Sequence, residues 1–156
     1  MRADEIPVAH TPSGGYGADM PPPVLERCDE PLVAGAPDMR GLWRTVSVEW
    51  ASGMEPDPDP MADHVQRIEQ CGNRVCITSA GIVHDMRADG TVENGVNDVA
   101  AAGGQEISVV CTFEDGAHVL RPIGMPGIEV KRWLEGDQLV WTYGPMFTAR
   151  LERVDG

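Results

Sequence analysis

Hydrophobic and polar residues alternate along residues 41–50 in a way that predicts a β-strand. This segment, Gly-Leu-Trp-Arg-Thr-Val-Ser-Val-Glu-Trp, is rich in Trp, Val and Thr and contains no Pro. Because successive side chains of a strand point to opposite faces, one face would carry Trp43, Thr45, Ser47 and Glu49, and the other would carry Leu42, Arg44, Val46, Val48 and Trp50. Neither face is fully polar, so we expect both faces to be covered, as in a barrel whose inner face lines a lumen.

Short runs of the same kind, separated by turn residues, continue to the C-terminus. We expect strands at residues 41–50, 64–70, 74–80, 82–87, 91–92, 96–100, 106–114, 117–121, 128–134, 138–143 and 147–154. Gly72-Asn73 and Asp115-Gly116 are typical hairpin turns, and no segment has the periodicity of a helix. The pattern predicts an all-β fold, an antiparallel up-and-down β-barrel of about 8–10 strands, or a sandwich. Sequential hairpins favour the barrel, because closing the sheet removes its edges.

The N-terminal segment has a different composition. Residues 1–37 contain seven Pro and no sustained periodicity, so we expect an extended arm followed by a barrel domain at 38–156. The apolar residues Val24, Leu25, Leu32 and Val33 could dock on the barrel or on the partner subunit of a homodimer. Since the arm has no core pattern of its own, we expect the barrel to fold without it.

The arrangement of residues 41–154 resembles the calycins, the superfamily of lipocalins and fatty-acid-binding proteins. The resemblance rests on Gly41 and Trp43 at the start, on the hairpin at 134–140, and on the closing run from Thr148 to Val154. It implies a barrel that binds a small apolar or amphipathic molecule in its lumen. It also implies that Arg150 or Arg153 stacks over Trp43. The Pro-rich residues 55–60 depart from the fatty-acid-binding proteins, because they leave no room for a helical lid.

Arginines on the strands are the candidate anchors for a ligand. Arg67, Arg121, Arg132 and Arg150 lie in runs with apolar alternates, and a buried Arg is costly unless an anion or a carboxylate pairs with it. The resemblance favours Arg150, with Arg132 and Arg121 as alternatives. Trp141 and Tyr143 share a face that either stacks a ring-bearing ligand or belongs to the core. Together with Trp43, these residues form the predicted ligand-binding set.

An enzyme on the same barrel is the alternative function, namely a cyclase, isomerase or hydro-lyase. His84, Asp85, Glu69 and Tyr143 are its candidate acid–base residues. Alternation places His84 and Asp85 on opposite faces, so a His–Asp pair would need a partner from another strand. Asp85 and Arg87 could instead form a cross-strand ion pair. A third interpretation is an interaction module whose arm exchanges onto a partner.

Charge and cysteine content limit the classes of binding partner and the cellular compartment that we expect. The net charge is −13 and the 12 Lys and Arg residues are scattered, which argues against nucleic acid and anionic membranes as partners. Without a signal-like or membrane-spanning apolar run, we expect a soluble, cytoplasmic protein. We therefore expect reduced cysteines, with a Cys71–Cys76 disulfide as the alternative.

Metal and cofactor sites have little support in the sequence. The cysteines lack the paired spacing of a zinc site. His64, His84 and His118 could meet at a metal, but their spacing does not indicate it, and the closing strands have no His for haem. We expect no metal and no cofactor.

Overall fold

The computed structural model describes residues 1–12, 15–17, 19–57, 59, 61–79, 81–92 and 108–154. In this part of the chain a short 3₁₀ turn, η1 (Ala3–Glu5), precedes nine strands. The strands are β1 (Gly41–Trp50), β2 (Val65–Cys71), β3 (Arg74–Ser79), β4 (Ile82–Arg87), β5 (Val109–Glu114), β6 (Ala117–Pro122), β7 (Glu129–Glu135), β8 (Gln138–Gly144) and β9 (Phe147–Arg153). No helix among these residues is long and apolar enough to span a membrane.

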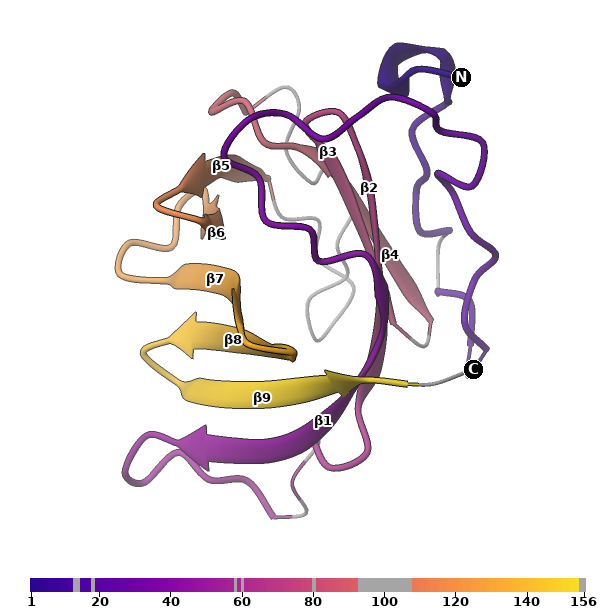
Figure 1. Ribbon diagram of the computed structural model, residues 1–156. Helices are drawn as coiled ribbons and strands as arrows, with labels where there is room; N and C mark the ends of the chain where they lie inside the picture. Colours follow the sequence, from indigo (N-terminus) through magenta and orange to yellow (C-terminus); the bar gives the residue numbers. More distant parts are fainter. Residues whose placement is uncertain are drawn as a thin grey trace.

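The strands form one antiparallel sheet that curls into a nearly closed barrel (Figure 1). The strand order is β4-β3-β2-β1-β9-β8-β7-β6-β5, so the first and last strands of the chain pair at its centre. The prediction of an all-β up-and-down barrel is confirmed. Residues 91–92 form no strand, and the strand expected at 96–100 lies outside the described residues.

A register shift in β1 corrects the faces assigned from the sequence. The pairing of β1 with β9 shifts between Thr45 and Ser47, as in a β-bulge. Beyond the shift, Val48 rather than Ser47 packs against the core. Strict alternation therefore fails in the second half of this strand, because one extra residue reverses the faces.

Part of the barrel interior is filled by apolar side chains. Met39, Trp43, Ile68, Leu139 and Leu151 are almost completely buried. The indole Nε1 of Trp43 donates a hydrogen bond to the carbonyl of Met39 at 2.9 Å. The guanidinium of Arg153 lies 4.4 Å from the centre of the Trp43 ring. The expected stacking of a closing-strand arginine on Trp43 is confirmed, with Arg153 in that role.

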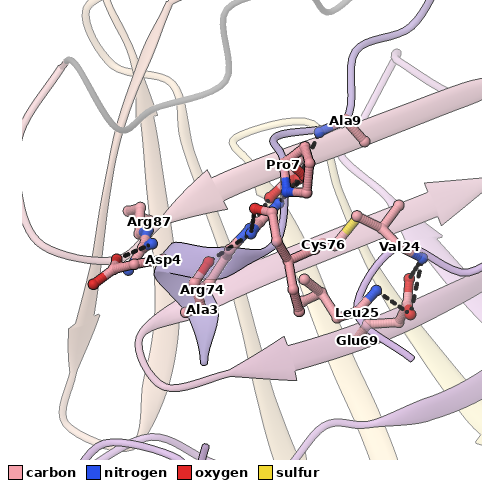
Figure 2. A network of polar contacts seen from close by, with 12 residues as sticks. Ala3, Asp4, Pro7, Ala9, Val24, Leu25, Glu69, Arg74, Cys76 and Arg87 are labelled. Atoms are coloured by element: carbon pink, nitrogen blue, oxygen red, sulfur yellow. Dashed lines mark hydrogen bonds and ion pairs between the residues drawn. The ribbon is translucent and has the colours of Figure 1, made fainter. Parts of the chain in front are cut away.

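The N-terminal arm runs along the outer face of β2, β3 and β4 (Figures 1 and 2). There a second apolar cluster joins arm residues Ala3 and Leu25 to strand residues Cys71, Cys76 and Val83. Gly72 in the β2–β3 turn permits this approach, because its φ is +61° and an added Cβ would lie 2.5 Å from Glu30 of the arm.

A disulfide joins the arm to the barrel and corrects the cysteine prediction. Cys28 and Cys71 are bonded although 43 positions separate them, while Cys76 and Cys111 are free thiols. Neither fully reduced cysteines nor a Cys71–Cys76 bond describes the structure. The partner of Cys71 became identifiable only once the arm was placed against β2.

Polar contacts also hold the arm against the barrel (Figure 2). Arg74 and Asp85 form an ion pair whose side chains are each only 1% exposed. Arg74 also donates to the carbonyls of Ala3, Ile6 and Pro7 at 2.6–2.9 Å. Its guanidinium thus uses all of its donors.

Glu69 and Arg87 of the barrel also make polar contacts with the arm. Glu69 accepts the backbone N–H groups of Val24 and Leu25. Arg87 pairs with Asp4 of the arm at 2.6 Å. The expected pairing of Asp85 with Arg87 is therefore wrong, since the arm provides Arg87 with another carboxylate and Asp85 bonds to Arg74.

Candidate ligand-binding cavity

The barrel interior also holds a cavity of about 200 Å³. Its polar lining consists of His64, Gln66, Ser79, His84, Arg132 and Tyr143. Its apolar lining consists of Ile77, Met86, Val109, Leu120, Pro122, Val130 and Trp141. These residues come from β2 to β8 and from His64 just before β2, so seven of the nine described strands shape the cavity, and β1 and β9 do not line it. A mostly apolar pocket with a few polar groups is the usual form of a small-molecule site.

Arg132 is the charged group of this cavity. It lies in the middle of β7, directly opposite His118 on β6 and Trp141 on β8, and it is 6% exposed. Its Nε donates to Oε1 of Gln66 at 3.0 Å, and its guanidinium carbon lies 4.5 Å from the centre of the Trp141 ring. Within the described part of the chain, no carboxylate pairs with Arg132 and its terminal nitrogens make no hydrogen bond. Burial lowers the pKa of Arg132 to about 9, so the side chain is still a cation at neutral pH.

Gln66 links this cation to a histidine. Because Oε1 of Gln66 accepts from Arg132, its Nε2 is left to donate to Nε2 of His64, 3.0 Å away. His64 must then be unprotonated at Nε2, and the neutral ring fits this chain of bonds. Burial, followed by the charge of Arg132, lowers the pKa of both His64 and His84 to about 4. At neutral pH Arg132 is therefore the cation in a lumen whose histidines are neutral.

Aromatic rings form one wall of the cavity. The rings of His64 and Trp141 lie 5.4 Å apart. Phe147 packs behind this wall, edge-on to Trp141 at 5.1 Å and stacked on Tyr143 at 5.8 Å. These contacts fix the planes of the rings that face the lumen.

The predicted ligand-binding residues fall into two groups. Arg132, Trp141 and Tyr143 line the cavity, as the alternation of β7 and β8 allows. Trp43 belongs to the apolar core and does not line the cavity. Arg121 pairs with Glu114 and Glu129, and Arg150 lies 3.6 Å from Glu135, so the structure places both arginines in partly exposed ion pairs away from the cavity lining.

The candidate acid–base residues are also divided. His84 and Tyr143 line the cavity. Asp85 and Glu69 lie on the opposite face of the sheet, bound to Arg74 and to the arm. The structure thus brings no carboxylate from this set to His84.

The sequence pattern did not identify three residues that line the cavity, namely His64, Gln66 and Ser79. Gln66 alternates with Ile68 and Gln70 on one face of β2, and all three are buried. The sequence signal for Gln66 was that a polar amide shares a strand face with the apolar residue Ile68. It could not be interpreted until the inner face of β2 was known.

A buried thiol and imidazole lie next to this site without lining it. Sγ of Cys111 and Nε2 of His118 are 2.7 Å apart, and both residues are fully buried. Burial raises the pKa of the Cys111 thiol to about 12, and burial with the charge of Arg132 lowers the pKa of His118 to about 3. The pair is therefore neutral, unlike an activated thiolate–imidazolium pair. No cluster of potential metal ligands occurs among the residues that the structure describes.

Comparison of the barrel with solved structures identifies its fold. Human cRBP IV is similar with a TM-score of 0.61 and 16% identity over 75% of this chain and 98% of that chain. The chain has the calycin fold. This calycin barrel is also similar to the REP1-NXSQ fatty acid transporter, with a TM-score of 0.57 and 21% identity over 76% of this chain and 98% of that chain.

A third similar calycin structure is the zebrafish ileal bile acid-binding protein complexed with cholic acid. Its TM-score is 0.54 and its identity is 18%, over 74% of this chain and 98% of that chain. No protein-family model matches the sequence, and no curated protein matches it either. The similarity is therefore one of fold.

Proposed function

We propose that this calycin barrel binds a small amphipathic anion in its lumen, with Arg132 as the anchor. The observation that carries the proposal is a buried cation that lines a cavity and has no carboxylate partner among the described residues. An unpaired buried charge costs several kcal/mol unless another charge offsets it. A ligand carboxylate or similar group would supply that charge, while the apolar lining holds the rest of the molecule.

The similar structures support the general class of ligand. Two of them are named for carboxylic acids, a fatty acid in one case and cholic acid in the other. Those ligands belong to those proteins. For this chain they support an apolar or amphipathic ligand in general, and Arg132 supports the anionic group.

Paired probes of equal size test the proposal. We expect octanoate to bind the wild-type protein more tightly than octanamide does, because only octanoate carries a charge. Arg132→Met should weaken octanoate binding by about 1.5–3 kcal/mol, the value of a charge-assisted hydrogen bond, and should hardly change octanamide binding. Isothermal titration calorimetry measures both affinities.

Arg150→Met is the matched control, since it removes an arginine that lies outside the cavity lining. We expect it to leave both affinities unchanged. Replacing an unpaired buried charge with an apolar side chain is often stabilising, so Arg132→Met should keep its melting temperature. If Arg132→Met weakened the binding of octanoate and octanamide equally, or weakened neither, Arg132 would not be the anchor.

The compartment and the oligomeric state stay predictions. The cytoplasmic location rests on the absence of a signal-like or membrane-spanning run, and reduced cysteines were expected from that location. The Cys28–Cys71 disulfide counts against it, because disulfides persist mainly in oxidising compartments. A homodimer formed through the arm would have to leave intact the contacts that the arm makes with its own barrel.

A further inference from the structure

The cavity volume limits the size of the ligand, an inference that rests on the proposed lumenal site. An engineered apolar cavity of about 150 Å³ holds one benzene molecule, so the cavity of about 200 Å³ has room for one six-membered ring with a small substituent. One ring and a short acidic group fill that space. The chain of a long fatty acid does not fit within it.

The lining favours a flat ligand over a flexible one. Four lining residues present planar rings, namely His64, His84, Trp141 and Tyr143. Phe147 holds two of these rings from behind, at 5.1 Å from Trp141 and 5.8 Å from Tyr143. Fixed planar walls suit an aromatic ring, which gains from offset and edge contacts. An alkyl chain of the same carbon count would lose more conformational freedom on entering the site.

The anchor and the ring wall are adjacent. Arg132 and Trp141 are cross-strand partners, with the guanidinium carbon 4.5 Å from the centre of the indole ring. A carboxylate bound to the terminal nitrogens of Arg132 therefore keeps its substituent in the cavity that His64, His84 and Tyr143 also line. Ile77, Met86 and Leu120 provide apolar lining elsewhere in the cavity.

We propose that the ligand of this barrel is a compact aromatic carboxylic acid, a single ring joined by a short linker to the carboxylate that Arg132 holds. The cavity volume restricts the size of the ligand, the planar lining restricts its shape, and the adjacent cation restricts its charge. The proposal excludes long-chain lipids as the preferred ligands.

Four carboxylates separate these restrictions by isothermal titration calorimetry on the full chain. Phenylacetate, cyclohexylacetate and octanoate have the same number of carbon atoms but present an aromatic ring, a saturated ring and an open chain. Hexadecanoate keeps the carboxylate and tests size. We expect phenylacetate to bind most tightly, by about two- to tenfold over cyclohexylacetate, the range expected from an aromatic contact.

Tyr143→Leu should remove much of the preference for phenylacetate over cyclohexylacetate. Trp133→Leu is its control, because Trp133 is absent from the cavity lining and its Nε1 bonds to Glu135. Should Tyr143→Leu prove unstable, the wild-type affinity order alone decides the matter.

Each other outcome overturns a stated part of the account. If hexadecanoate binds more tightly than phenylacetate and its binding is lost in Arg132→Met, the proposal of a compact ligand is wrong. The proposed function, an anion held by Arg132, then still stands. Equal affinities for phenylacetate and cyclohexylacetate overturn the aromatic preference. Absence of binding by all four acids, or binding that is unchanged in Arg132→Met, overturns the proposed function itself.

Discussion

At the scale of single residues, burial and, after it, the charge of Arg132 keep the neighbouring histidines neutral. Through Gln66, Arg132 leaves Nε2 of His64 as an acceptor, and its charge adds to burial in lowering the pKa values of His64, His84 and His118. A second cation beside Arg132 would be repelled, so among the described lining residues Arg132 alone is positively charged at neutral pH. An anion that entered the cavity would meet Arg132 with neutral rings around it.

The lowered pKa of His84 gives a measurable pH dependence of stability. Unfolding returns the pKa from about 4 to its usual 6.5, so between these values the unfolded state binds a proton that the folded state lacks. Stability should therefore be unaffected by His84 above the unfolded pKa and should fall with pH below it. From about pH 7 to pH 5 this one group should cost about 2 kcal/mol.

Chemical denaturation at these two pH values, in wild type and His84→Gln, measures this effect. The variant should lose about 2 kcal/mol less than wild type on acidification. An identical acid response in wild type and His84→Gln would show that His84 is not held neutral.

At the scale of elements, β3 and β4 serve two surfaces at once. Ile77, Ser79, His84 and Met86 face the lumen, while Arg74 and Asp85 face the arm. Alternation of side chains makes this possible, since neighbouring residues of a strand belong to opposite faces. The arm therefore covers the back of the wall that shapes the cavity.

The buried ion pair Arg74–Asp85 should contribute far more to stability than the exposed ion pair Arg87–Asp4. Asp85→Asn keeps the side-chain shape but leaves Arg74 charged and buried, so we expect a loss of roughly 3–5 kcal/mol in the free energy of unfolding. Asp4→Asn is the control, because Asp4 is 86% exposed in its pair with Arg87, and its effect should stay within about 0.5 kcal/mol. Urea denaturation compares the two, and similar losses would contradict the structural role of the buried pair.

The arm itself can be tested by truncation. We still expect residues 38–156 to form the barrel, but without the arm Arg74 loses three carbonyl acceptors and Glu69 loses two N–H donors. The truncated barrel should therefore melt well below the full chain. Thermal unfolding followed by circular dichroism measures this, and an unchanged melting temperature would show that the arm is only an appendage.

At the scale of the whole molecule, alternation and turn residues were enough to predict the barrel. His84 and Met86 were assigned to one face and Asp85 and Arg87 to the other, and the structure agrees. The shared face of Trp141 and Tyr143 was also correct. These assignments succeeded because they depend only on neighbouring residues in regular strands.

Features that depend on distant parts of the chain could not be predicted in this way. The sequence could not choose among Arg121, Arg132 and Arg150, since the choice requires the inner face of each strand in the closed barrel. The bulge in β1 reversed the faces beyond Thr45, and Cys28 met Cys71 across 43 positions. In each case a tertiary contact or an inserted residue overrides the local pattern.

The central claim is that Arg132 holds an anion inside the barrel, and nitrogen-15 NMR of the arginine guanidinium groups tests it most directly. The Arg132 signals, assigned by their loss in Arg132→Met, should shift saturably on addition of octanoate and should stay in place with octanamide. The signals of Arg121 and Arg150 should not move, because these arginines lie outside the cavity lining. Binding of octanoate that leaves the Arg132 signals unmoved, or that shifts only the two outer arginines, would contradict the account.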